Sequence, residues 1–188
     1  MILYLHGFCS SPRSEKARIL AQRMAERALA DRFWCEQLPV GPSQAIEFVE
    51  TVLAKCPMPP SLVGSSLGGY YATYLAEKHD LRAVLVNPAA YAYRSLASAV
   101  GPQRNLYTGE PFEFTERHLA ELAELEVPRF SRPERFWLMV ETGDEVLDYR
   151  EAVEKYAGAR QTVIEGGGHS FRHFAGYLDA IIDFSLTA

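Results

Sequence analysis

The feature that most constrains the fold is a glycine-rich run, Gly64 to Gly69, which separates an apolar stretch from a helical pattern. The stretch before it, Ser61-Leu62-Val63, has the composition of a buried strand, and Tyr70 to His79 after it is typical of a helix. Glycine allows strained dihedrals and close contact between a strand and the helix that follows it. A sharp strand-to-helix turn of this kind indicates a sheet with helices packed on it.

The alternation of strand and helix patterns continues along the chain. Further strands are expected at residues 2–5, 33–38, 83–86, 136–140 and 161–164, and further helices at residues 14–31, 42–57 and 174–186. Such alternation implies crossovers that place helices on both faces of a parallel sheet. The predicted fold class is therefore α/β, a three-layer α/β/α sandwich with a mostly parallel sheet.

Residues 89–135, between two of the expected strands, are too many for a plain connection. They contain one helical pattern, from Thr115 to Leu125. We expect this segment to form a small helical cap over the functional site. With 188 residues, the chain is expected to be a single domain, and the cap is an insertion within it.

Composition excludes several classes of partner. The formal net charge is −5 and no run of Lys or Arg occurs, so neither nucleic acid nor a membrane surface is an expected partner. No stretch approaches the roughly 20 apolar residues that cross a bilayer, and the first residues lack the pattern of a signal peptide, so a cytoplasmic location is expected. The three cysteines, Cys9, Cys35 and Cys56, have unrelated spacings, which indicates neither a disulfide framework nor a metal site.

The pattern Gly64-x-Ser66-x-Gly68 fits a nucleophile elbow, in which a serine lies on a tight turn at the carboxyl edge of a sheet. The backbone N–H of Leu67 follows the serine at a helix N-terminus, where the helix dipole favours an oxyanion. The alternative is a purely structural Gly-Ser turn. Ser65 occupies the second position of the elbow, where its side chain is expected to pack or cap.

A serine nucleophile needs a base, so the fold must bring a histidine to the same edge of the sheet. Of the five histidines, only His169 follows an expected strand through a glycine run, Gly166 to Gly168. The alternative is a loop histidine that is exposed and has no role. We predict that His169 is the base.

The orienting acid in this fold comes between the serine and the histidine in the sequence. Asp144 follows Gly143 at the end of an expected strand, whereas Asp148 lies four residues further on, where it could cap a helix. The alternative for Asp144 is a turn aspartate that bonds its own backbone. Asp144 is the favoured acid.

The loop after the first strand, His6 to Cys9, is the candidate for the second oxyanion donor, through the backbone N–H of Phe8. The side chains of Phe8, Tyr70 and Tyr71 are expected to wall an acyl pocket, although aromatic residues in such places are more often plain core. Cys9 lacks a dedicated base, so it is not expected to be a reactive thiol.

Five stretches of the chain together resemble the small bacterial esterases of the YqiA-like family, within the α/β-hydrolase superfamily. They are Tyr4 to Phe8 with Ser10 to Pro12, Gly64 to Ala72, Leu85 to Ala89, Gly143 to Tyr149 and Gly166 to Phe171. The resemblance implies hydrolysis of short acyl esters or of acyl thioesters such as acyl-CoA, through Ser66, Asp144 and His169, without a cofactor. Two positions depart from the family pattern, which more often has asparagine at Cys9 and an acidic residue at Gly168.

Other functions remain open on the same site. One fold hosts many chemistries, so peptide cleavage, lactone cleavage and a lyase reaction are alternatives among enzymes. The alternative outside enzymes is a protein that binds a small molecule without turnover. The expected partner in each case is a small molecule, and the sequence does not indicate an oligomeric state.

Overall fold

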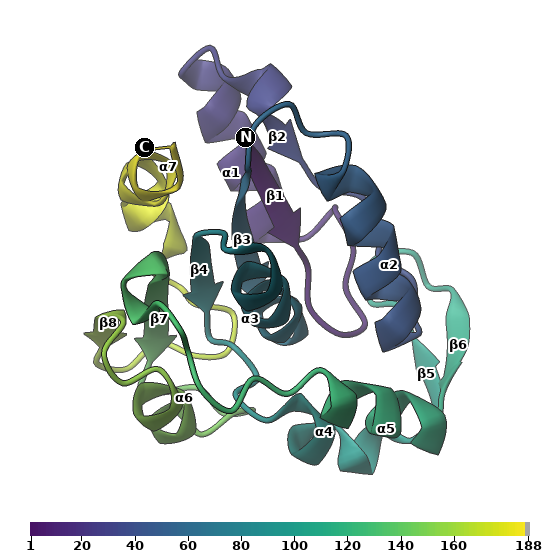
Figure 1. Cartoon of the computed structure of the whole chain (residues 1–188). Helices are drawn as coiled ribbons and strands as arrows, with labels where there is room; N and C mark the ends of the chain where they lie inside the picture. The colour runs from purple at the N-terminus through teal and green to yellow at the C-terminus, as the bar shows by residue number, and fades with distance from the viewer. Residues whose placement is uncertain (187–188) are drawn as a thin grey trace.

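The computed structural model describes residues 1–186 and contains a six-stranded sheet with helices on both faces (Figure 1). Neighbouring strands are parallel throughout the sheet. In spatial order the strands are β2 (Phe33–Trp34), β1 (Ile2–Leu5), β3 (Ser61–Ser65), β4 (Ala83–Val86), β7 (Phe136–Glu141) and β8 (Arg160–Ile164). The prediction of a three-layer sandwich with a mostly parallel sheet is confirmed.

Alternating side chains of the strands form two separate apolar layers. Leu3, Leu85 and Leu138 face one layer, and their neighbours in the strands face the other. Helices α2 (Pro42–Leu53), α3 (Leu67–His79) and α6 (Tyr149–Lys155) cover the first layer, and α1 (Glu15–Glu26) and α7 (Leu178–Leu186) cover the second. Because both faces are buried, the strands carry continuous apolar runs instead of an alternating pattern.

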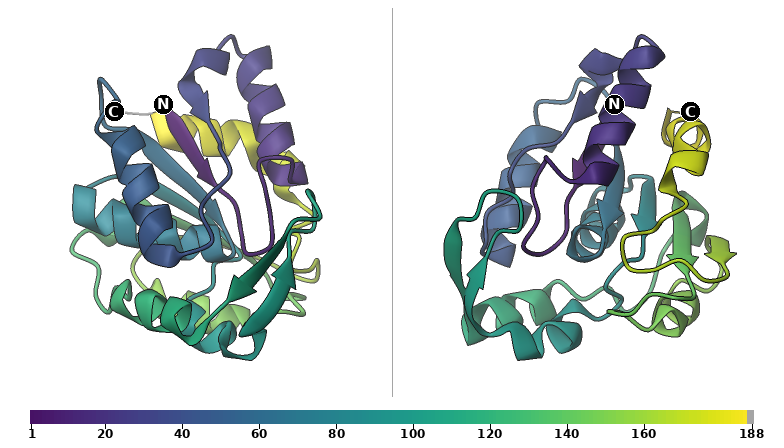
Figure 2. Two further views of the ribbon diagram at one scale, coloured as in Figure 1. Left: turned by 90° about the vertical axis from the view of Figure 1, so that its right-hand side faces the viewer. Right: turned by 180° about the vertical axis from the view of Figure 1, so that it is seen from behind.

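The connection between β4 and β7 differs in part from the predicted helical cap. It contains the helices α4 (Ala92–Ser95) and α5 (Glu116–Glu124), but also an antiparallel hairpin of β5 (Gly101–Arg104) and β6 (Pro111–Phe114). In Figure 2 the hairpin lies beside the loop that follows β1, and the Leu106 N–H donates to the Cys9 carbonyl at 2.8 Å. These strands are short and partly exposed, so their apolar pattern is weak.

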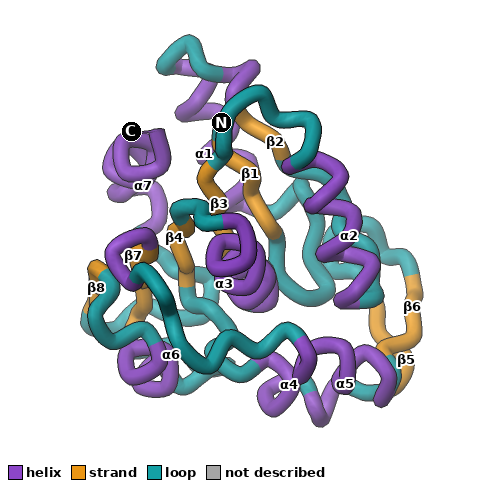
Figure 3. The backbone as a smooth tube through the Cα atoms, in the orientation of Figure 1, coloured by secondary structure: helices purple, strands orange, loops and turns teal. Residues whose placement is uncertain are grey.

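Several element boundaries differ from the sequence-based expectation. Strand β2 has two residues, instead of the six expected at 33–38, because the Leu38 N–H donates to the His6 ring instead of to a neighbouring strand. Helix α1 ends at Glu26 because Ala28 takes a positive φ of 57° and the Leu29 N–H closes onto the Met24 carbonyl. The tube in Figure 3 shows the long loops that result.

The remaining short elements are 3₁₀ turns. They are η1 (Ala30–Arg32), η2 (Ala97–Ala99), η3 (Pro133–Arg135) and η4 (Phe174–Tyr177). The last of these replaces the first turn of the helix expected at 174–186. No helix within residues 1–186 is both long enough and apolar enough to span a membrane.

The order of the strands places a crevice between the carboxyl ends of β1 and β3. The chain leaves β1 for β2 on one side and then returns to β3 on the other side of β1. Loops that leave two neighbouring strands in opposite directions open a crevice, where ligands bind in sheets of this kind. The loops after β1 and β3 carry Phe8 and Ser66, the residues that the sequence singles out.

Candidate active site

Ser66 lies on a strained turn between β3 and α3. Its φ of 55° and ψ of −120° are unusual for a residue with a side chain. A Cβ on Gly64 would lie 2.2 Å from the Gly68 carbonyl oxygen, and a Cβ on Gly68 would lie 2.0 Å from the Leu5 carbonyl oxygen. The two glycines therefore permit the close packing that holds Ser66 in this conformation.

The structure brings Ser66, His169 and Asp144 together. The Nε2 atom of His169 lies 3.2 Å from Ser66 Oγ, and its Nδ1 atom lies 2.9 Å and 3.0 Å from the two carboxylate oxygens of Asp144. The Asp144 side chain is 1% exposed and the His169 side chain 25% exposed. The Ser66 hydroxyl, the His169 imidazole and the buried Asp144 carboxylate are thus linked by consecutive hydrogen bonds.

Asp144 is held as an ionised acceptor. Burial opposes its ionisation, but hydrogen bonds from His169 and from the N–H groups of Leu147 and Val146 outweigh burial and lower the pKa of Asp144 below its ordinary value. An ionised carboxylate accepts the proton on His169 Nδ1, which leaves Nε2 free to accept the serine proton. Because Asp144 also accepts the N–H groups of Val146 and Leu147, it has the role of a turn aspartate as well.

Asp148, the other acidic candidate, has a different role. Its side chain accepts the Arg150 N–H at 3.0 Å and caps the N-terminus of α6. Its carboxylate also forms an exposed ion pair with the Arg150 guanidinium. Asp148 is thus occupied at the start of a helix, as the alternative interpretation of that residue expected.

The ring of His6 fixes the loop that carries Phe8. His6 Nε2 accepts the Leu38 N–H at 3.0 Å, so Nδ1 carries the proton and donates to the Gly7 carbonyl, also at 3.0 Å. Burial lowers the pKa of His6 below its ordinary value, which keeps the ring neutral. Because the carbonyl and N–H of a trans peptide point in opposite directions, the Phe8 N–H is aimed away from the His6 ring.

The Phe8 and Leu67 backbones both lie next to the serine. A Cβ on Gly7, the residue before Phe8, would lie 3.2 Å from the Cβ of Ser66. Leu67 is the first residue of α3, where an N–H group has no acceptor within its own helix. The two N–H groups that the sequence predicts as oxyanion donors thus belong to backbone segments beside Ser66.

The loop that carries His169 is tied to the ends of β4 and β7. Asn87 donates from its side-chain amide to the carbonyls of Gly168 at 3.0 Å and His169 at 3.1 Å. The fully buried Glu141 carboxylate accepts the Gly168 N–H at 2.6 Å and both the N–H and the ring Nδ1 of His173, at 3.0 Å and 2.8 Å. These contacts determine where the imidazole of His169 lies.

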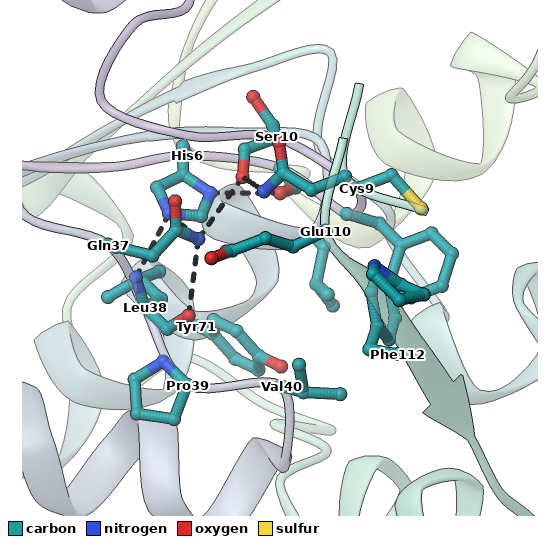
Figure 4. A pocket seen from close by; sticks show the side chains of 15 residues that line it. His6, Cys9, Ser10, Gln37, Leu38, Pro39, Val40, Tyr71, Glu110 and Phe112 are labelled. Atoms are coloured by element: carbon teal, nitrogen blue, oxygen red, sulfur yellow. Dashed lines mark hydrogen bonds between the residues drawn. The ribbon is translucent and has the colours of Figure 1, made fainter. Parts of the chain in front are cut away.

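Two cavities meet at the loop after β1. The apolar pocket, about 400 Å³ in volume, is lined among others by Phe8, Leu38, Val40, Tyr71 and Phe112 (Figure 4). The serine pocket, about 360 Å³, is lined among others by Ser66, His169, Lys16, Tyr107 and Glu145. Gly7, Phe8 and Ser10 line both cavities, so the loop after β1, called the oxyanion loop below for the role that the sequence predicts, lies between them.

The expected aromatic wall is present in part. Phe8 and Tyr71 line the apolar pocket, but Tyr70 is not among its lining residues. The Tyr70 hydroxyl donates instead to the Leu122 carbonyl in α5 at 2.7 Å, so Tyr70 joins α3 to the β4–β7 connection. For Tyr70 the plain-core alternative is the better description.

The remaining candidates for reactive or metal-binding side chains are separated from one another. Burial raises the pKa of the Cys9 thiol, which lies 3.8 Å from the Gln103 amide oxygen. His79 contacts Glu50, and His118 completes the capping box of α5. In the described part of the chain, no group of three or more His, Cys, Asp or Glu side chains could hold a metal ion.

A family model matches nearly the whole chain. The model of the uncharacterised protein family UPF0227 matches residues 1–186. This chain belongs to UPF0227. The membership confirms the resemblance to the YqiA-like family that the sequence motifs indicate.

Solved structures similar to the UPF0227 chain have the α/β-hydrolase fold. Mouse alpha/beta hydrolase domain-containing protein 10 is 16% identical with a TM-score of 0.71, over 97% of this chain and 89% of the mouse chain. Est1E from Butyrivibrio proteoclasticus is 14% identical with a TM-score of 0.69, over 98% and 86%. A monoacylglycerol lipase from Paleococcus ferrophilus is 14% identical with a TM-score of 0.66, over 97% and 92%. At these identities the likeness shows the fold.

Several residues of the UPF0227 site escaped the sequence analysis. Asn87 directly follows β4 and Glu141 is the last residue of β7, and a buried polar residue at such a position is a signal that could have drawn attention to them. Phe112 belongs to the alternation Pro111-Phe112-Glu113-Phe114, which is typical of a strand and lies near the turn residue Gly109. Val40 carries no signal, because nothing in its neighbourhood predicts that it reaches the pocket.

Proposed function

We propose that this UPF0227 chain is a serine hydrolase that cleaves carboxylic esters, including thioesters, through an acyl-serine intermediate. The observation that carries the proposal is the hydrogen-bond sequence from Ser66 Oγ to His169 Nε2 and from His169 Nδ1 to Asp144. The positive φ of Ser66 is typical of an exposed nucleophile at an elbow. A monoacylglycerol lipase is among the solved structures that share the fold, which is consistent with this chemistry.

The first step forms the acyl-serine. His169 Nε2 takes the Ser66 proton as Oγ attacks the carbonyl carbon, and the oxygen of that carbonyl becomes an oxyanion held by the N–H groups of Phe8 and Leu67. When the tetrahedral intermediate collapses, the bond to the leaving group breaks. His169 gives its proton to the departing oxygen or sulfur.

The second step releases the acid. Water loses a proton to His169 and attacks the acyl carbon, and the same two N–H groups hold the new oxyanion. The bond to Ser66 Oγ then breaks and the proton returns from His169 to that oxygen. Asp144 stabilises the imidazolium in both steps without itself accepting the proton.

The experiment compares two neighbouring serines. Purified protein is assayed with 4-nitrophenyl acetate and labelled with a fluorophosphonate, and Ser66→Ala is compared with Ser65→Ala. We expect Ser66→Ala to lower kcat by about 10³-fold or more and to abolish labelling. Ser65 is 6% exposed and has no hydrogen bond to His169, so its loss is expected to be mild.

Three outcomes would count against this assignment. Equal losses from both variants would contradict Ser66 as the nucleophile. Absence of both turnover and labelling in the unchanged protein would favour the alternative of a binding protein. Turnover without a covalent adduct at Ser66 would favour a hydrolase with a different mechanism.

A further inference from the structure

The apolar pocket and the serine pocket lie on opposite sides of the oxyanion loop. Ser66 and His169 line the serine pocket and do not line the apolar pocket. Phe8 and Leu67, whose N–H groups are the oxyanion donors, line the apolar pocket. A bound carbonyl group therefore has one cavity on the histidine side and a second cavity beyond the oxyanion donors.

The chemistry of the reaction assigns a substituent to each side. In the proposed function His169 protonates the leaving group, so the leaving group must lie within reach of His169 Nε2, in the serine pocket. The carbonyl carbon carries only one other substituent, the acyl chain. With the leaving group on the histidine side and the carbonyl oxygen turned to the two N–H groups, the acyl chain extends on the side away from His169, where Phe8 and Leu67 line the apolar pocket.

Aliphatic and aromatic side chains form much of the lining of the apolar pocket, and the polar side chains of Gln37, Asn105 and Glu110 complete it. Leu38 is 6% exposed and Tyr71 is 2% exposed, and they lie across the pocket from Phe112 of the β5–β6 hairpin (Figure 4). The Phe8 ring packs edge-on against Phe112 and Phe114, with centroids 5.8 Å and 5.0 Å apart. The hairpin therefore supplies a wall that the sheet and its helices do not.

The hairpin is fixed in place beside the site. The Asn105 side chain, 8% exposed as a residue, donates to the Ser10 carbonyl at 2.8 Å and accepts the N–H groups of Tyr107 and Thr108. One side chain thus ties the hairpin turn to the oxyanion loop. A wall held in this way keeps the pocket formed before a ligand binds.

We propose that the apolar pocket binds the acyl chain of the substrate, and that it selects apolar acyl chains of medium length, longer than the short acyl esters that the family resemblance implies. The inference rests on the proposed function and deepens it. A volume of about 400 Å³ is near the lower end of the roughly 300–1,000 Å³ that small-molecule pockets span. Val40 lines the pocket and is 41% exposed, so the pocket opens to water there and a longer chain extends past it.

Burial of each added methylene is expected to raise kcat/KM by up to about fourfold, until the pocket is filled. The probes are 4-nitrophenyl acetate, butyrate, octanoate and dodecanoate. We expect kcat/KM to rise at least about tenfold from acetate to octanoate, and to change less than about threefold from octanoate to dodecanoate. A flat series, or a continued steep rise to dodecanoate, would overturn the selection of medium chains.

The decisive comparison uses two exposed valines. Val40→Trp places a large ring at the opening of the apolar pocket, and Val163→Trp makes the same change on β8, where Val163 is 47% exposed and lines neither pocket. We expect Val40→Trp to lower the octanoate-to-acetate ratio of kcat/KM by about tenfold, and Val163→Trp to leave that ratio unchanged. Thermal melts of both variants show whether the fold is retained.

Failure of the pocket assignment and failure of the proposed function give different results. If Val40→Trp, like the control Val163→Trp, leaves the octanoate-to-acetate ratio of kcat/KM unchanged, the acyl chain does not occupy the apolar pocket. If the unchanged protein hydrolyses none of the four esters, or if Ser66→Ala retains full rates, the proposed function itself is wrong.

Discussion

The buried carboxylate of Glu141 accepts the backbone N–H of Gly168 at 2.6 Å, one residue before His169. The run of glycines that ends there has positive φ at Gly166 and Gly167, a conformation that residues with a side chain rarely adopt. A Cβ on Gly167 would lie 1.8 Å from a carboxylate oxygen of Glu141, so the loop packs directly on this acid. Glu141 is therefore a positioning residue for the loop that carries His169.

Glu141→Gln tests this positioning role. The amide keeps the shape of the side chain, but its NH₂ group must face either the Gly168 N–H or the donors of His173, so one buried donor loses its acceptor. We expect the free energy of unfolding to fall by about 1–3 kcal/mol, and kcat to fall with it as His169 shifts. Denaturant titration and ester hydrolysis measure the two effects.

The matched control is Glu165→Gln, which changes an exposed glutamate just after β8. We expect it to change neither the free energy of unfolding nor kcat. If Glu141→Gln has no larger effect than this control, the loop does not depend on the buried carboxylate.

The charge of Glu141 also predicts a pH dependence. Burial opposes ionisation, but the backbone N–H groups of His173 and Gly168 and the ring of His173 outweigh burial and lower the pKa of Glu141 below its ordinary value of 4.5. A carboxyl group with a lowered pKa stabilises the fold above its unfolded pKa, and this contribution is lost as the pH falls through the lowered value. The stability difference between the unchanged protein and Glu141→Gln should therefore shrink below about pH 4.5.

Urea titrations at several pH values between 7 and 3 measure that difference. Glu165→Gln serves again as the control, since we expect its difference from the unchanged protein to stay constant. A difference for Glu141→Gln that grows on acidification would contradict the sign derived from the pKa of Glu141.

Asp144→Asn separates the two roles of this aspartate. Asparagine still accepts the N–H groups of Val146 and Leu147, so the turn is retained, but it cannot hold His169 with the proton on Nδ1. We expect kcat to fall by about 10²- to 10⁴-fold, as in the corresponding change in a serine protease, with a change in stability below about 1 kcal/mol. Ester hydrolysis and thermal unfolding provide the measurements.

Asp148→Asn is the paired control, because asparagine is as good an N-cap as aspartate. Its rate and stability should remain close to those of the unchanged protein. If the two variants lose activity equally, the assignment of Asp144 as the orienting acid is wrong.

The sequence predicted the parts of the molecule in which a local pattern and a long-range requirement coincide. The elbow at Ser66 needs glycine on both sides for close packing, so a short run of neighbouring residues is enough to recognise it in the sequence. Asp144 and His169 follow apolar strands, and parallel strands bring their carboxyl ends to one edge. The parallel sheet and the layer of helices on each face follow from the same periodicity.

Other features depend on contacts between distant segments that leave little local pattern. The early end of β2 results from the ring of His6, more than 30 residues away, which takes the Leu38 N–H. The β5–β6 hairpin is held by Asn105, whose partner Ser10 is 95 residues distant in the sequence. Tyr70 could not be separated from Tyr71 by pattern, because which of two adjacent aromatic residues faces a pocket depends on how α5 packs on α3.

Gly68→Ala tests how closely the elbow depends on packing. A Cβ at this position would lie 2.0 Å from the Leu5 carbonyl oxygen and 2.6 Å from that of His6, and both are backbone atoms that cannot rotate away. The helix must therefore move away from β1, at a cost of about 3 kcal/mol or more. Gly176→Ala is the control, since a Cβ there would meet nothing within 4 Å. We expect thermal unfolding to show a large loss for Gly68→Ala alone. Equal stability of the two variants would mean that α3 can shift without strain and that the close approach at Gly68 is not required.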